Sequence, residues 1–96
     1  MTCTLHPEAD RELREAIAYY EMREAGLGTE FAVEVCAALG RIADHPNAWP
    51  VLEGDLRRCL RNRFPYGLIY SIEPDSIFIL AVMHLHRDPD YWRQRL

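Results

Sequence analysis

The sequence contains no lysine, and all eleven basic side chains among its 96 residues are arginines. Arginine binds carboxylates and phosphates through a rigid fork of donors, but it does not exchange protons near neutral pH. Acid–base chemistry would therefore depend on histidine, tyrosine, aspartate or glutamate. The net charge of −4 disfavours non-specific binding to nucleic acid, and we expect no direct sequence-specific DNA binding.

Long apolar runs and paired cysteines are also missing. No segment approaches the roughly 18 consecutive apolar residues that span a bilayer, and the first residues lack the apolar core of a signal peptide. We therefore expect no membrane association and a cytoplasmic location. The three cysteines, Cys3, Cys36 and Cys59, form no CxxC pair. They are expected to be buried, reduced thiols, with no disulfide, metal or other cofactor.

The length indicates a single domain over residues 1–96. The pattern predicts, in chain order, a short strand over 2–6, a helix from Pro7 that stops at Gly26, a helix from Thr29 to Pro46, a loop over 45–55, strands over 56–63, 66–73 and 77–84, and a short helix beginning at Asp88-Pro89. This order is typical of the α+β class. We expect an N-terminal helical hairpin packed on one face of a small twisted antiparallel sheet: a short first strand, then a three-strand meander.

In the first helix, apolar residues recur at helical spacing. The predicted buried stripe comprises Ala9, Leu13, Ala16, Ile17 and Tyr20. The predicted solvent-facing side comprises Arg11, Glu12, Arg14 and Glu15. In the second helix, Thr29 is expected to act as the N-cap through its hydroxyl.

The stretch RRCLRNRFPYGLIY, over residues 57–70, holds four arginines in its first seven positions. Residues 1–50 carry nine acids and four arginines, whereas residues 51–96 carry six acids and seven arginines, so positive charge gathers in the second half. Strand alternation places Arg57, Cys59, Arg61 and Arg63 on one face, and Leu56, Arg58, Leu60 and Phe64 on the other. We expect the second face to lie under the helices. The arginine face would then be a docking surface for phosphates or carboxylates, or else a solvated strand face whose charges deter aggregation.

Two tyrosines extend this candidate surface. Tyr66 and Tyr70 alternate with Gly67 and Ile69, so they share one strand face, next to the arginines.

The stretch MHLHRDPDYW, over residues 83–92, suggests a second candidate site. Cleavage of RNA without a metal needs a base, a cation near the phosphate and an acid. His84 or His86 could be the base and Tyr91 the acid. The cation could come from Arg61, Arg63 or Arg87. Alternatively, the histidines are structural and Tyr91 packs the C-terminal helix; a His-x-His metal site would lack a third ligand.

Taken in order, these motifs resemble the toxins of the RelE/ParE superfamily of type II toxin–antitoxin systems. The matching segments are HPEADRELREAIAYYE, GLGTEFAVEV, RI with a following WP, RRCLRNRFPYGLIYSIE, and AV followed by HRDPDYW. The resemblance covers nearly the whole chain. It implies an α+β toxin that is neutralised by a cognate antitoxin.

Within this superfamily, ribosome-dependent mRNA endonucleases use lysines and an arginine in the region of PYGLIY. This chain has no lysine, and Gly67 stands at the place of that arginine. The segment therefore looks closer to ParE-like, plasmid-stabilisation toxins, which implies inhibition of DNA gyrase by binding. A ribosome-associated mRNA endonuclease and an inactive, interaction-only relative are the alternatives. The expected surface for the antitoxin or target comprises Arg57, Arg61, Arg63, Tyr66, Tyr70 and Arg87.

Overall fold

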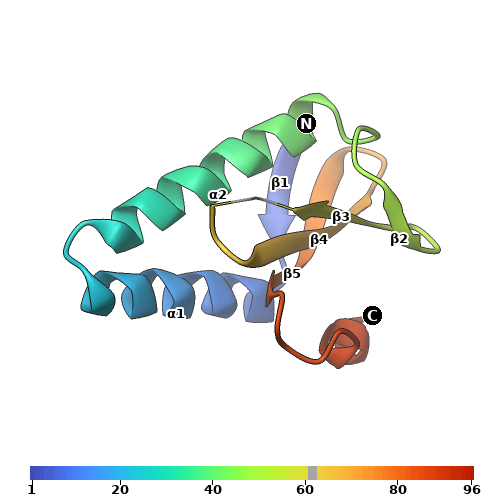
Figure 1. Cartoon of the computed structure of the whole chain (residues 1–96). Helices are drawn as coiled ribbons and strands as arrows, with labels where there is room; N and C mark the ends of the chain where they lie inside the picture. Colours follow the sequence, from blue (N-terminus) through green and yellow to red (C-terminus); the bar gives the residue numbers. More distant parts are fainter. Residues whose placement is uncertain (61–62) are drawn as a thin grey trace.

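The computed structural model describes residues 1–60 and 63–96. Its elements are β1 (Thr2–Leu5), α1 (Pro7–Arg23), α2 (Leu27–Asp44), β2 (Val51–Glu53), β3 (Leu56–Leu60), β4 (Tyr66–Ile72), β5 (Ser76–His84) and the 3-10 helix η1 (Tyr91–Arg95). The two long helices form a hairpin that covers one face of the sheet (Figure 1). The predicted α+β class is confirmed.

The sheet has five strands in the order β1-β5-β4-β3-β2. Strands β2 to β5 are antiparallel neighbours, as expected of a meander, but β1 runs parallel to β5. The prediction of an entirely antiparallel sheet was therefore wrong for β1, and β2 lies within the stretch predicted as a loop. A period-2 pattern identifies strands without specifying the direction of their neighbours, and a three-residue strand is too short to show the pattern.

The turn between α1 and α2 differs from the predicted capping. Gly26, with a φ of 90°, is the N-cap of α2, which begins at Leu27, so the predicted Thr29 cap was wrong. The Glu21 carboxylate in α1 accepts hydrogen bonds from the amides of Gly26 and Gly28, at 2.9 and 3.0 Å. A side chain of the preceding helix thus satisfies the free amides at the start of α2.

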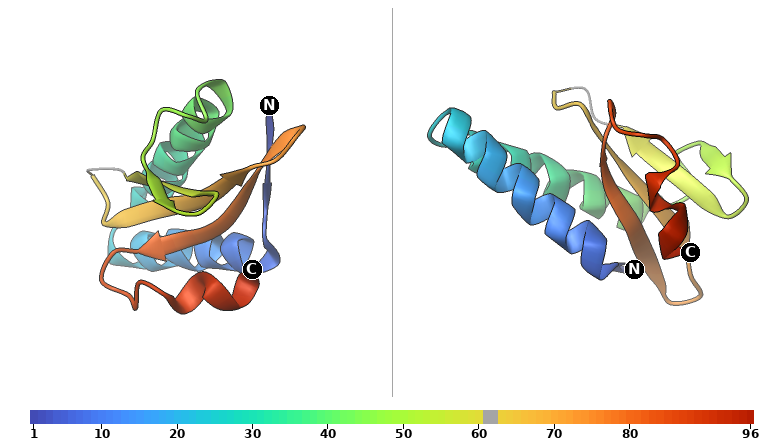
Figure 2. Two further views of the ribbon diagram at one scale, coloured as in Figure 1. Left: turned by 90° about the vertical axis from the view of Figure 1, so that its right-hand side faces the viewer. Right: turned by 90° about the horizontal axis from the view of Figure 1, so that it is seen from below.

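Both faces of the sheet are covered. The larger core lies between the helical hairpin and the sheet and includes Phe31, Ile42 and Tyr70. A smaller core lies on the opposite face, where Trp92 of η1 packs against Leu56 and other apolar side chains of β3, β4 and β5. Figure 2 shows η1 on the side of the sheet away from the hairpin. The predicted C-terminal helix is present as a short 3-10 helix, but it begins at Tyr91 with Asp90 as its N-cap, so the predicted start at Asp88-Pro89 was wrong.

The three cysteines are free, but only Cys59 is fully buried. Cys3 is half-buried, and Cys36 is exposed on α2, which corrects the prediction for that residue. No helix in the described part of the chain has the length and apolar character needed to cross a membrane.

Candidate functional site

The arginine-rich strand is oriented oppositely to our expectation. Cys59, which shares the Arg57 face, is fully buried in the core under the helices, whereas Leu56 lies in the smaller core beneath η1. The prediction that the Leu56 face lies under the helices was therefore wrong. Alternation separates the two faces but does not say which layer covers each, and here a segment distant in sequence covers the second face.

Arg57 acts inside the fold. Its Nη1 donates to the carbonyl oxygen of Trp49 at 2.5 Å and lies 3.4 Å from that of Asn47. Tyr70 acts in the same region, because its buried hydroxyl donates to the Pro46 carbonyl at 2.6 Å. Both side chains hold the segment between α2 and β2 against the sheet. The sequence predicted that Arg57 and Tyr70 contact the antitoxin or target. In the structure their polar groups bind backbone carbonyls of this chain instead.

Arg63 lies at the surface near α2. Its Nη2 is 2.9 Å from the Glu30 carboxylate, and both side chains are about half exposed, at 50% and 47%. Such a pair is solvated and contributes little to stability, so its arginine remains available to another carboxylate. Arg61, the neighbouring predicted residue, lies outside the described residues.

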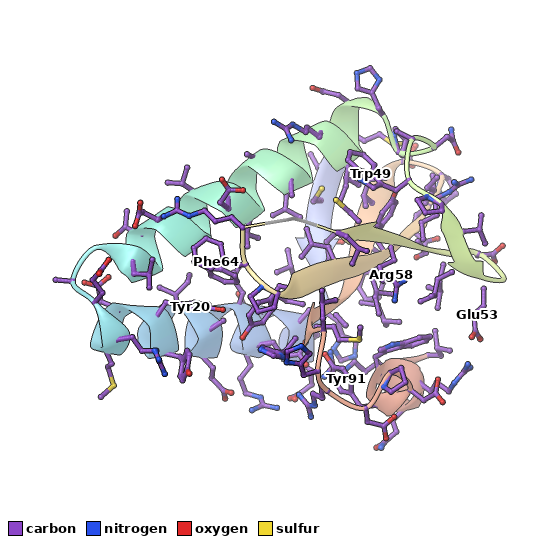
Figure 3. The ribbon with its side chains drawn as sticks, viewed as in Figure 1. Tyr20, Trp49, Glu53, Arg58, Phe64 and Tyr91 are labelled. Carbon is purple, nitrogen blue, oxygen red and sulfur yellow. The ribbon has the colours of Figure 1, made fainter. Side chains whose placement is uncertain are left out.

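Tyr66 lies at the margin of the helix-facing core. Its ring centre is 5.0 Å from that of Phe31 and 5.1 Å from that of His84. Burial raises the pKa of Tyr66 to about 12, with further contributions from neighbouring tyrosines and from Glu12. Tyr66 is therefore a neutral hydrogen-bonding group at physiological pH. Figure 3 shows Phe64 and Tyr20, which belong to the same aromatic cluster, between the hairpin and the sheet.

The two candidate histidines are neighbours. Their ring centres are 5.1 Å apart, and the His86 amide donates to Nδ1 of His84 at 3.1 Å. Nδ1 of His84 is thus an acceptor, which leaves Nε2 as the only position for an exchangeable proton on the neutral ring. His84 is half-buried at the end of β5, and His86 is exposed.

Beside the histidines, the Tyr91 ring lies between two arginines. The guanidinium carbons of Arg87 and Arg95 are 3.8 and 4.9 Å from its centre. The Tyr91 hydroxyl is buried next to the Glu12 carboxylate. Burial, together with the adjacent Glu12 charge, raises the pKa of Tyr91 well above its ordinary value. A buried phenol of this kind is a poor proton donor to an external substrate.

Glu12 lies in a different environment from the one that the sequence predicted. It was predicted to face solvent, but it is only 8% exposed. Its carboxylate accepts hydrogen bonds from Arg95 and from the Val82 amide, at 2.8 and 3.0 Å, and lies 3.4 Å from Arg87. Its spacing was informative, because Glu12 lies three residues after the buried Ala9. Burial alone would raise the pKa of Glu12, but these hydrogen bonds and the Arg95 charge lower it.

A shallow pocket of about 310 Å³ lies where these groups meet. Its lining residues are Glu12, Glu15, Ala16, Tyr19, Tyr66, Val82, His84 and Arg87. Two carboxylates and one arginine line it, so the pocket does not favour a polyanion. The predicted nuclease groups Arg63 and Tyr91 are absent from this lining. No group of three or more metal-ligating side chains was found in the described part of the chain.

Comparisons with known proteins agree with this architecture. Residues 4–89 match the family described as "ParE toxin of type II toxin-antitoxin system, parDE". One similar solved structure is that of a chromosomal ParDE toxin–antitoxin system from P. aeruginosa, with a TM-score of 0.65 and 13% identity over 90% of this chain and 97% of the other. No curated protein matches the sequence significantly. Because the family match extends over most of its length, the chain belongs to the ParE toxin family of type II toxin–antitoxin systems.

Proposed function

We propose that this toxin acts by binding DNA gyrase in the cytoplasm, without chemistry of its own, and that a cognate antitoxin neutralises it. Such a pair would also serve to stabilise a plasmid. The observation that carries the proposal is that the described nuclease candidates do not all line one pocket, although His84 and Arg87 share one. His84 lines the pocket, Arg63 pairs with Glu30 on α2, and the hydroxyl of Tyr91 is buried.

The surroundings of Gly67 support the same conclusion. A nuclease of the related type would place an arginine at this position. A Cβ atom built on Gly67 would lie 3.0 Å from Cδ2 of Leu60 and 3.5 Å from Cδ2 of Leu85. Cγ of Arg58 also lies 3.5 Å from this position, so two leucines and the stem of Arg58 surround the place where the nuclease pattern has its arginine.

The gyrase assay uses purified toxin with supercoiling and with trapped DNA-cleavage complexes as readouts. We expect both inhibition of supercoiling and accumulation of cleaved complexes, reversed by the antitoxin. Normal gyrase activity in excess toxin, with the toxin folded and bound by its antitoxin, would reject gyrase as the target.

For the antitoxin contact, we propose the surface around Arg63 and Tyr66. Next to this surface, an apolar slot lies between α2 and β4; it is lined by Phe31, Glu34, Val35, Ala38, Phe64, Tyr66 and Leu68. Arg63 at its margin can exchange Glu30 for an antitoxin carboxylate. Arg87, which lines a pocket with Tyr66, would extend the same surface, whereas Arg57 and Tyr70 act within the fold.

Charge reversal tests this contact. Arg63→Glu should weaken antitoxin binding and flatten its salt dependence, because a cross-interface ion pair is lost. Arg14→Glu is the matched control, since Arg14 is 77% exposed on α1. Equal antitoxin affinities for the two variants would exclude Arg63 from the contact.

The second candidate function is ribosome-dependent mRNA cleavage, and the adjacency of His84 and His86 favours it. Mapping transcript ends after induction of the toxin tests it, with His84→Ala/His86→Ala as the control. Intact transcripts during growth arrest would eliminate this candidate. An inactive, interaction-only relative would instead cause no arrest.

A further inference from the structure

A small apolar surface with one arginine lies on the sheet face away from the hairpin. We call it the Gly67 patch and define it as Arg58, Leu60, Gly67 and Leu85. Leu60 and Leu85 are 45% and 37% exposed. Arg58 Cγ and Leu85 Cδ2 each lie 3.5 Å from the position of a Cβ on Gly67, and Leu60 Cδ2 lies at 3.0 Å. The three side chains therefore converge over Gly67 and fill the space that a larger residue would need.

Register explains why these residues meet. In β3 and β4, Leu60 is opposite Gly67, and Arg58 is opposite the buried Ile69. The Arg58 side of β3 is the side that Leu56 shares, which faces η1, and Figure 3 labels Arg58 on this strand. The patch thus borders the smaller core where η1 ceases to cover it.

Arg58 and the exposed Arg41 differ from the other arginines of the described chain. Most of them form a hydrogen bond or ion pair with a side chain or carbonyl, as Arg57, Arg63 and Arg95 do. Among the described residues, Arg58 has no such partner, and it is half-buried. A partly desolvated cation beside leucines is poorly stabilised by the fold itself, and a carboxylate brought by another molecule would stabilise it.

We infer that the Gly67 patch is the surface by which the toxin holds its protein target. The complementary occupant is a protein segment that presents a carboxylate next to an apolar side chain. The carboxylate would pair with Arg58 while the apolar group packs between Leu60 and Leu85. This inference rests on the proposed function in one respect, namely that the toxin acts by binding a protein.

Nucleic acid is a poorer match for this surface. A phosphate backbone requires several cations along its path, whereas the patch offers one arginine between two leucines. Apolar side chains beside a single arginine are instead typical of protein interfaces, in which arginine is enriched while other charged residues are depleted.

The test measures growth arrest on toxin expression without antitoxin. The patch variants are Arg58→Glu, which opposes the partner's carboxylate, and Leu60→Ser/Leu85→Ser, which removes the apolar contact. The controls are Arg14→Glu and Val33→Ser, because Arg14 and Val33 are exposed on the helices at 77% and 61%. Antitoxin affinity and thermal unfolding verify that each variant is folded.

We expect both patch variants to need at least about tenfold more toxin for arrest, with antitoxin affinity unchanged, while the controls behave as wild type. Since the two leucines are partly exposed, the serine variant keeps the test valid even if Arg58→Glu unfolds. Patch variants that are fully toxic would overturn the inference. The inference would also be overturned if the patch variants lost only antitoxin binding. A difference in sedimentation between wild type and patch variants would overturn it too, because it would show that the patch joins two copies of the toxin.

The same experiment separates this inference from the gyrase proposal. If the wild-type toxin arrests growth without inhibiting purified gyrase, the gyrase proposal fails, and the patch variants still decide whether the surface holds the target. If the wild-type chain causes no arrest, both are rejected.

Discussion

Glu12 in α1 and Arg95 in η1 form a bidentate ion pair, with both nitrogen–oxygen distances at 2.8 Å. Their side chains are only 7% and 9% exposed. Arg95 also donates to the Leu80 carbonyl at 3.1 Å. The pair therefore holds the C-terminal turn against both α1 and β5.

Removing one partner of this pair should destabilise the fold strongly. Arg95→Met leaves the Glu12 carboxylate buried without its principal partner, so we expect a loss of about 3–5 kcal/mol in the free energy of unfolding. Urea denaturation measures it. The double variant Glu12→Leu/Arg95→Met removes both charges and should regain most of the loss; equal stability of the single and double variants would contradict this account.

Stability should also depend on pH through Glu12. Its pKa is lower in the folded state than the ordinary value of 4.5, so the unfolded chain binds the proton more tightly. The stabilisation is fully present above about 4.5 and is lost as pH falls through the lower, folded-state pKa. Unfolding curves from pH 7 to 3 test this. The Glu12→Gln variant should show a weaker decline, and an identical decline would assign the effect to other carboxylates.

Two helical glycines offer a matched comparison. A Cβ on Gly28 would lie 2.5 Å from the Ile17 carbonyl oxygen and 2.9 Å from Cβ of Glu21, so Gly28→Ala should destabilise the hairpin by about 1–3 kcal/mol. Gly40 has nothing within 4 Å of that position, and Gly40→Ala should stabilise α2 by roughly 0.5–1 kcal/mol. Thermal unfolding should therefore shift in opposite directions; a stabilising Gly28→Ala would refute the close packing.

The Tyr70 hydroxyl should stabilise the segment between α2 and β2. Tyr70→Phe removes its 2.6 Å bond and leaves the Pro46 carbonyl without this donor, at a cost of about 1–3 kcal/mol. Hydrogen exchange of residues 45–50 should also become faster. Tyr19→Phe is the control, because Tyr19 is 54% exposed and its change should stay within about 0.5 kcal/mol. Similar effects of the two substitutions would argue against a tether.

The sequence identified many residues of the candidate site, but it did not predict which groups their side chains contact. His84 and His86, each a candidate base, are close in sequence, and their rings are 5.1 Å apart. Arg57 and Tyr70 were expected to face a partner, but their hydrogen bonds go to the carbonyls of Trp49 and Pro46. Backbone acceptors in an irregular segment leave no periodic signal, so such contacts are invisible in the sequence.

Arg58 is a residue for which the sequence predicted no binding role, although its position in the structure suggests one. Its apolar neighbours in the strand suggested a core face, and it received no role as a binding residue. The structure places it at the margin of the core beneath η1, next to Leu60 and Leu85. Arg58 combines partial burial with the lack of a partner among the described residues, whereas Arg41, which also has none there, is exposed; only coordinates reveal this.

The sequence by itself determined the class of this protein: two helices followed by strands, and the motifs of a toxin family. Helix and strand propensities and hydrophobic periodicity depend on residues close together in the sequence. They can therefore be recognised without knowledge of the fold. Tertiary structure alone decided which sheet face each layer covers, that β1 runs parallel to β5, and that Glu12 is buried. Those outcomes depend on contacts between distant segments, of which the Glu12–Arg95 pair, 83 residues apart, is the clearest case.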